Sequence, residues 1–296
     1  MLPSSCGGGT HSGPASNLIA FSSDRALAPR SEAEDFNTHR LDLYLMDARG
    51  GHVVRLTNND LTDAFPAVSR DGKQIAFDRD LGGHAQVFVL DLRDRKVHML
   101  THARANSGLP AWSPDGRRIA FATDRNAPGG DVIYVMNADG TGQAAVTHNL
   151  PGSNDAWPSW APDGRHLAFA RETGGGSAIY TVGLDGRGLK RLTVDANALD
   201  TQPAWSPDGN VIAFETDLFM LPGQIFAMRP DGRRRRQLTD PSVGASSRPS
   251  WSSDGRRIVF MASRDHHTNV WAMNADGSHQ TQLTRNHGFA GFPGAG

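Results

Sequence analysis

Short apolar runs alternate with polar turns along the whole chain. A Pro-x-Trp-Ser-Pro-Asp-Gly motif or a close copy begins at Pro110, Pro158, Pro203 and Pro249, and a looser copy begins at Pro66. Each is followed by an Ile-Ala-Phe type of run, then by a run rich in β-branched and aromatic residues, and then by a second Asp-Gly turn. Such runs are typical of β-strands. The pattern predicts units of four short antiparallel strands, which we name A to D, with tight A–B and C–D turns.

A Leu-Thr or Val-Thr pair closes each unit and sets its period. The closing threonines are spaced 44 to 46 residues apart, at Thr57, Thr101, Thr147, Thr193, Thr239 and Thr284. Four antiparallel strands every ~45 residues is the period of a β-propeller blade. One such sheet buries its two faces only against neighbouring sheets. We therefore expect an all-β, six-bladed propeller over residues 17–296, preceded by a flexible leader over residues 1–16.

The spacing also predicts how the ring closes. Pro66 lies nine residues after Thr57, and the same count from Thr284 leads to Pro293. Residues 290–296 are thus expected to supply strand A of the first blade, so that the C-terminal strand completes a sheet begun near Leu18. This arrangement joins the two chain ends and covers a sheet edge. The alternative supplier of that strand is the segment Thr10–Ser16.

The series of motifs resembles the WD40-like repeat called PD40, which builds the six-bladed propeller of the TolB family. The resemblance implies the fold and says less about function, because the motif residues mainly form turns and pack. TolB itself carries an α/β domain before its propeller, and this sequence offers nothing to supply one. We therefore expect a stand-alone TolB-like propeller. The resemblance also implies a bacterial, extracytoplasmic or periplasmic location.

Composition limits the partners. The chain has 30 Lys and Arg against 31 Asp and Glu, and this near-neutral charge gives no support for a nucleic-acid partner. No run reaches the ~20 apolar residues of a transmembrane helix. The single cysteine, Cys6, excludes an intrachain disulfide. Small residues before Cys6 and glycines after it resemble a lipoprotein processing site, so a lipid anchor is one expectation. An idle cysteine in a disordered tail is the alternative, and a cytoplasmic location stays open.

Three aspartates occupy one repeated position in the D–A loops, three residues before the strand-A proline. They are Asp63, Asp155 and Asp200. Because these loops are expected to approach the central channel, the three carboxylates are candidate ligands for Ca²⁺ or another divalent cation at the channel mouth. The alternative is that each aspartate binds the backbone of its own loop. No other cofactor is expected.

Two further sets of residues share the expected loop face. His102 and His148 follow the closing threonine in adjacent units, where they are candidates to share a ligand or to lie exposed. Arginines follow strand B and are candidates to bind carboxylates or to bridge neighbouring blades through Asp24, Asp80 or Asp124. These arginines are Arg25, Arg79, Arg125, Arg171 and Arg264.

No catalytic motif accompanies these residues: the sequence lacks G-x-S-x-G, Walker A and H-E-x-x-H patterns. We therefore predict a non-enzymatic, monomeric propeller that binds a protein or peptide. Binding is expected on the face of the B–C and D–A loops, where residues 25–40 form the longest loop. The alternative is a lyase-like or hydrolase-like enzyme, or a metal-dependent binder of small ligands, acting at the channel mouth.

Overall fold

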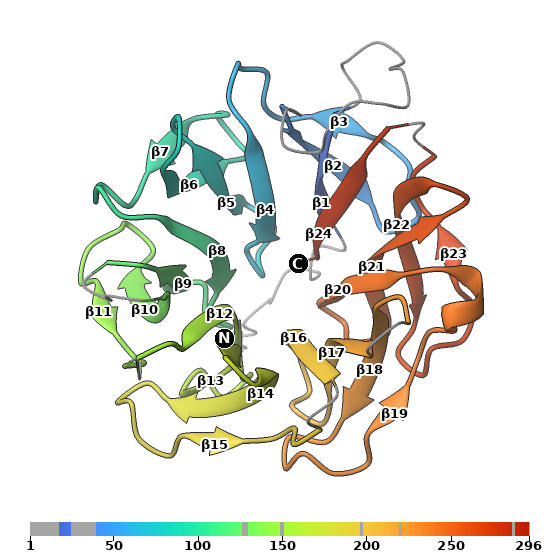
Figure 1. Cartoon of the computed structure of the whole chain (residues 1–296). Helices are drawn as coiled ribbons and strands as arrows, with labels where there is room; N and C mark the ends of the chain where they lie inside the picture. The colour runs from blue at the N-terminus through green and yellow to red at the C-terminus, as the bar shows by residue number, and fades with distance from the viewer. Residues whose placement is uncertain are drawn as a thin grey trace, which may run out of the picture.

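The computed structural model describes residues 18–24, 40–125, 130–148, 151–195, 198–218, 221–285 and 288–295. The expected leader with Cys6, the residue Arg25 and most of the long loop after it lie outside these ranges. Apart from one 3₁₀ turn, the regular elements among the described residues are all β-strands, arranged as sheets around a common centre (Figure 1). The all-β prediction is therefore confirmed. Among the described residues, no helix has the length and hydrophobicity needed to span a bilayer.

The described strands form six antiparallel units of four, in agreement with the expected number of blades. The innermost strands, equivalent to strand A, are β24 (Ala290–Ala295), β4 (Asp63–Val68), β8 (Ser107–Trp112), β12 (Asn154–Trp160), β16 (Ala198–Trp205) and β20 (Ser246–Trp251). The B strands are β1 (Leu18–Ser23), β5 (Gln74–Asp80), β9 (Arg118–Thr123), β13 (His166–Thr173), β17 (Ile212–Leu218) and β21 (Arg257–Arg264).

In the outer half of each unit, strand C is about as long as the inner strands and strand D has only two or three residues. The C strands are β2 (Asp42–Asp47), β6 (Ala85–Asp91), β10 (Val132–Asn137), β14 (Gly176–Gly183), β18 (Gln224–Met228) and β22 (His267–Asn274). The D strands are β3 (Val54–Arg55), β7 (Val97–Met99), β11 (Ala144–Ala145), β15 (Lys190–Arg191), β19 (Arg236–Gln237) and β23 (Thr281–Gln282). A 3₁₀ turn, η2, covers Pro241–Val243. One parallel pair, Ser177 with Leu199, joins the fourth unit to the fifth.

The C-terminal strand completes the first unit, as the repeat spacing predicts. Strand β24 pairs antiparallel with β1, and the pairs run from Ser23 with Ala290 to Ile19 with Ala295. The hydroxyl of Ser23 also donates to the carbonyl of Phe289 at 2.8 Å. The ring is thus closed by hydrogen bonds between the two ends of the described chain.

The hydrophobic core lies between the blades rather than within them. The phenylalanines that end the B-strand runs, from Phe21 to Phe260, have no exposed surface. In the described chain, each of six hydrophobic clusters combines residues of two successive units. One of them packs Val270 of the last unit against Phe21 of the first. Burial between neighbours is therefore what holds the ring together.

The strand-A tryptophans reinforce this packing. The indole N–H groups of Trp112, Trp160 and Trp251 each donate to a carbonyl in strand A of the preceding unit, at 3.0 to 3.1 Å. Trp205 differs, because its indole donates to Gly209 in the turn of its own unit at 3.3 Å. Three of the four tryptophans therefore tie one inner strand to the next.

The closing threonine was expected to be the last residue of strand D, but in the structure its side chain has a role of its own. Each D strand ends before the Leu-Thr or Val-Thr pair, so strand D is shorter than expected. Each threonine hydroxyl then accepts a hydrogen bond from a backbone N–H near the start of strand C, at 2.9 to 3.0 Å. The Leu or Val before each threonine still donates its N–H to the carbonyl of the same strand-C residue, at 2.7 to 2.8 Å. The threonine hydroxyl therefore supplies the last bond of the ladder, which explains why threonine recurs.

Candidate functional site

Every inner strand carries the same irregularity beside the channel. In the second unit, Ala64 pairs with Asp78 and Ala67 pairs with Ala76, so that Phe65 and Pro66 together oppose Phe77 alone. This is a β-bulge, which bends the strand and redirects side chains. The other five inner strands shift register at the equivalent place. A bulge on an inner edge strand also suits proline, which has no N–H to give to a ladder.

The residue before each bulge proline has a left-handed backbone. Proline disfavours the right-handed helical region for the residue before it, and here the bulge holds that residue at a φ between 52° and 59°. None of the six is glycine, although such a conformation costs a non-glycine residue ~1–3 kcal/mol. We name these six residues the channel floor: Phe65, Leu109, Trp157, Gln202, Arg248 and Phe292.

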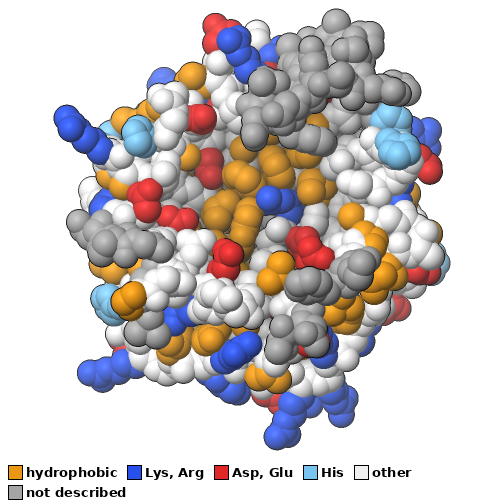
Figure 2. All heavy atoms as spheres, viewed as in Figure 1, with side chains coloured by type: hydrophobic (Ala, Val, Ile, Leu, Met, Phe, Trp, Pro, Cys, Tyr) orange, Lys and Arg blue, Asp and Glu red, His pale blue; other side chains and the backbone are white. Residues whose placement is uncertain are grey.

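The channel floor lines a cavity of about 300 Å³. The cavity extends from the floor along the inner strands to residues of the Ser-Pro-Asp-Gly turns, including Pro114, Pro162 and Pro207. Figure 2 shows hydrophobic side chains gathered at the centre of the ring around basic atoms, with acidic side chains nearby. The cavity lining therefore reaches the A–B turns, whereas the sequence predicted binding on the face of the B–C and D–A loops.

An arginine stands among aromatic rings in this floor. The guanidinium carbon of Arg248 lies 4.3 Å from the ring centres of Trp157 and Phe292 and 4.7 Å from that of Phe65. Phe65 also stacks on Phe292, with ring centres 4.5 Å apart. These contacts are cation–π interactions, which favour the positive charge of Arg248. They provide no oxygen or nitrogen atom that could accept a hydrogen bond from the guanidinium N–H groups. Nη1 of Arg248 is buried without a hydrogen-bond partner among the described residues, as is Oε1 of Gln202.

Two carboxyl groups lie behind the floor. Asp78 and Glu215 occupy equivalent positions, directly after the buried phenylalanines of β5 and β17. Burial raises the pKa of Asp78 well above its ordinary value, although the N–H of Leu109 donates to this carboxyl at 2.9 and 3.0 Å. Burial raises the pKa of Glu215 to about 7, against the opposing charge of Arg248. Burial lowers the pKa of Arg248 to about 10, and the two carboxyl groups oppose that shift.

Glu215→Gln is expected to remove a pH-dependent loss of stability. Burial raises the pKa of Glu215 from 4.5 to about 7, so in this window the folded protein binds a proton that the unfolded chain has released. The free energy of unfolding therefore falls as pH rises from 4.5 to 7, and the full loss persists above 7. Melting temperatures measured from pH 4 to 8 should show the difference between Glu215→Gln and the wild type shifting in favour of the variant between pH 4.5 and 7, and staying constant outside this window. The exposed Glu172→Gln is the control, and a pH-independent difference for Glu215→Gln would contradict the assignment.

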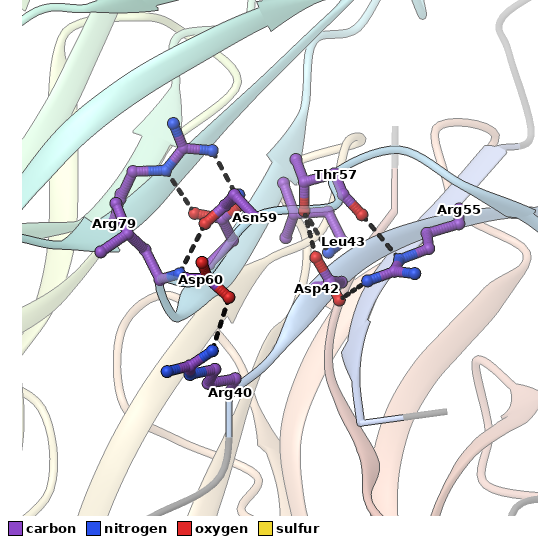
Figure 3. A network of polar contacts seen from close by, with 10 residues as sticks. Arg40, Asp42, Leu43, Arg55, Thr57, Asn59, Asp60 and Arg79 are labelled. Carbon is purple, nitrogen blue, oxygen red and sulfur yellow. Dashed lines mark hydrogen bonds and ion pairs between the residues drawn. The ribbon is translucent and has the colours of Figure 1, made fainter. Parts of the chain in front are cut away.

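The structure places the three predicted aspartates apart, each in its own unit. Asp63 accepts from Nε and Nη2 of Arg79 at 2.6 and 2.9 Å, and from Asn59 at 2.9 Å (Figure 3). Asp155 accepts two hydrogen bonds from Arg171 at 2.6 and 2.7 Å. These carboxylates are almost wholly buried, and the described residues contain no group of three or more His, Cys, Asp or Glu side chains arranged to hold a metal.

Asp200 is paired with an arginine that the sequence did not single out as a partner. It accepts from Thr216 at 2.8 Å and from Nη2 of Arg235 at 3.1 Å. Arg235 belongs to a basic run on the C–D turn and covers the rings of Phe214 and Phe226. The fifth unit has Thr216 where the second and fourth have Arg79 and Arg171, so an arginine from another strand connection takes over that role.

The other arginines also serve their own units. Arg79 and Arg171 each cover the two aromatic rings of their own B and C strands, rather than bridging neighbouring blades. Arg125 donates to Gln143 at 2.6 Å, and Arg264 donates to Ala245 and Ser246. Among the described residues, none of these arginines pairs with Asp80 or Asp124, the suggested partners for bridges between blades.

The two candidate histidines do not belong to a metal site among the described residues. His102 and His148 are both exposed at the ends of their units. The structure does not bring either of them into the cavity lining.

Comparison with known proteins decides the family. The model of the TolB beta propeller domain family, PD40, matches residues 109–289, which is more than half of the chain. The chain belongs to the TolB beta-propeller family. No curated protein sequence matches it closely enough to count as a relative.

Solved structures share the fold of this TolB-family propeller. A putative TolB from Agrobacterium tumefaciens is 22% identical, with a TM-score of 0.73 over 94% of this chain and 90% of that chain. TolB from Acinetobacter baumannii is also 22% identical, with a TM-score of 0.78 over 95% and 67%. An oligogalacturonate lyase from Vibrio parahaemolyticus is 14% identical, with a TM-score of 0.56 over 84% and 70%. At these identities the similarity shows the fold alone.

Sequence reasoning missed the channel floor and the carboxyl groups behind it. Two signals were present. The residue before the strand-A proline varies within an otherwise regular motif, and two carboxyl groups follow the B-strand phenylalanine where other units have small or apolar residues. A variable position in a regular repeat can thus mark the lining of a cavity.

Proposed function

We propose that this TolB-family propeller is a non-enzymatic scaffold that binds a protein or peptide segment in its central cavity. The observation that carries the proposal is the cavity of about 300 Å³, walled by inner strands of all six units. That volume lies at the lower end of known ligand sites, which span ~300–1,000 Å³. It accommodates a few side chains, so an extended segment or a loop tip fits it better than a folded surface.

The chemistry of the wall supports the same occupant. Prolines and tryptophans of the inner strands provide apolar surface, while Gln202 and Arg248 provide polar atoms without described partners. Few polar groups in an apolar pocket are typical of sites that orient a ligand. Membership of the TolB family supports an extracytoplasmic setting. Binding by the B–C and D–A loop face stays a prediction, because residues 25–39 lie outside the described ranges.

A library of random peptides, selected on the purified protein, tests the proposal. Selected peptides should bind the wild type and lose at least tenfold in affinity to Leu109→Trp and Gln202→Trp, which fill the cavity from its floor. Both positions already hold side chains at positive φ, so neither change adds a new kind of backbone strain. Leu189→Trp adds the same indole on an exposed C–D turn and should bind normally. Selected peptides that bind both filled variants at wild-type strength would overturn the proposed site.

A further inference from the structure

The guanidinium of Arg248 lacks a hydrogen-bond acceptor in the described structure. Three aromatic rings surround it, and no described residue accepts a hydrogen bond or forms an ion pair with it. A buried donor without an acceptor is costly, and a charged one more so. Arg248 also lines the cavity, so the missing acceptor can arrive from there. Arginine and carboxylate form a strong, frequently bidentate pair, which makes a carboxylate the matching group.

A second polar atom stands on the neighbouring inner strand. Gln202 on β16 lines the same cavity, and its Oε1 is buried without a described partner. Strands β16 and β20 lie side by side around the channel (Figure 1). An oxygen acceptor next to an arginine donor suits a ligand that carries a carboxylate and, one or two bonds away, an amide N–H. The last residue of a polypeptide has this combination.

The charges around Arg248 favour a ligand with one negative charge over a ligand with two. Asp78 and Glu215 both act on Arg248, and Asp217 adds its charge beside Glu215. A phosphate dianion would therefore meet one cation and several acidic groups, whereas a carboxylate adds a single charge.

We infer that the channel floor binds the C-terminal carboxylate of a peptide, with Arg248 donating to the carboxylate and Gln202 accepting from the terminal amide N–H. The inference rests on the proposed function, because it assigns one end of the segment that enters the cavity. The Trp157, Phe65 and Phe292 rings hold Arg248 in place and supply apolar contact for the terminal side chain.

Binding is coupled to protonation of the acidic groups behind the floor. The anion adds a negative charge near Glu215 and Asp78, so it raises the pKa of both groups further, and Arg248 remains positive throughout the range. Glu215 already has a pKa of about 7. Affinity is therefore highest below pH 7 and falls as pH rises above 7, because the bound anion then faces an ionised Glu215.

Calorimetric titration with N-acetyl-leucine and N-acetyl-leucinamide tests the carboxylate. At pH 6 the acid should bind at least tenfold more tightly than the amide, and the acid should lose severalfold in affinity by pH 8. Arg248→Met should abolish the preference for the acid, with its melting temperature measured to show that it folds. Arg187→Met removes an exposed arginine of a C–D turn outside the cavity lining and should keep the preference. Equal binding of acid and amide to the wild type would overturn the inference.

A second comparison tests Gln202. N-acetyl-leucine should bind more tightly than 4-methylpentanoic acid, which has the carboxylate and the side chain but no amide. Gln202→Leu should remove that advantage and leave the effect of Arg248 intact. An advantage that survives in Gln202→Leu would overturn the role given to this residue.

The source of the carboxylate is tested with peptides selected from libraries that display free C-termini. Such peptides should lose at least tenfold in affinity when they are synthesised as C-terminal amides. If the amides bind equally, the inference is overturned while peptide binding in the cavity stands. If N-acetyl-leucine binds with the expected preference but no library yields a binder, the peptide source and the proposed function are overturned together, and the floor is a site for a free carboxylic acid.

Discussion

A chain that ends at residue 289 is expected to melt at least ~10 °C lower than the whole protein, or to fail to fold. The deletion removes β24, whose pairing with β1 joins the first unit to the end of the chain. It also removes Phe292 from the channel floor and the fully buried Ala290 from the cluster between the last and first units. Loss of a fully buried aromatic side chain costs ~3–5 kcal/mol. The half-buried Phe292 contributes less than this, but the unpairing of a whole strand adds to the loss, and exposed strand edges promote aggregation. For domains somewhat smaller than this one, each kcal/mol shifts the melting temperature by ~2–4 °C.

The matched control is a chain that begins at residue 17. Since β1 pairs with β24 and β2, this shorter chain should keep its melting temperature within about 2 °C of the whole protein. Scanning calorimetry and light scattering on both truncations measure stability and aggregation. If the C-terminal truncation is as stable as the whole protein and the N-terminal one is not, then residues 10–16 close the ring instead.

Asp155→Ala is expected to destabilise the protein by about 3–5 kcal/mol. Asp155 is fully buried and the side chain of Arg171 is 7% exposed, so the substitution leaves a guanidinium enclosed without its counter-charge. Breaking a buried pair by removing one partner typically has an effect of ~3–5 kcal/mol. Asp155→Leu combined with Arg171→Met should recover most of this loss, because it removes both charges together. Denaturant midpoints for the single and double variants measure the difference.

Asp200 provides the comparison for this pair. Burial raises the pKa of Asp200, which means that its ionised form gains less from its surroundings than it loses by leaving water. Its arginine partner is also more exposed, at 25%. Asp200→Asn keeps the shape and an acceptor for Thr216, so it should cost no more than ~1 kcal/mol. Asp155→Asn should cost clearly more. Equal losses at the two positions would show that burial of the arginine does not control the effect.

The repeat made much of the fold predictable. Strand A, strand B and their turn follow from Pro-Asp-Gly and Ile-Ala-Phe spacing, and the count from Thr284 to Pro293 identified β24 before any contact was known. The end of strand D was less predictable, because the strand itself covers only two or three residues and a threonine side chain, rather than the backbone, supplies the last bond of its ladder. Nothing in local strand propensity distinguishes these two kinds of bond.

The candidate site was harder to predict, because it depends on side chains from different units. The Asp63 and Asp155 positions were recognised as special, but their cross-strand arginines satisfy them within one blade. Conversely, Gln202 and Arg248 have no motif of their own, and only the ring brings them to neighbouring places. In the fifth unit, Arg235 pairs with the aspartate in the way that Arg79 and Arg171 do in the second and fourth units, and the repeat did not predict this either. A role that can pass to another strand connection is not visible from repeat spacing.

The left-handed backbone of the channel floor is the same at all six positions, whereas the side chains that it presents to the cavity differ. Phenylalanine, leucine, tryptophan, glutamine and arginine all occupy the same strained geometry, so the bulge and its proline impose the strain whatever side chain is present. Exchange at these six codons therefore changes the chemistry of the floor while leaving the backbone strain nearly constant. A duplicated gene could acquire a new ligand by this route without compensating changes elsewhere. For engineering, the same six positions define a small combinatorial library whose members should share one stable scaffold.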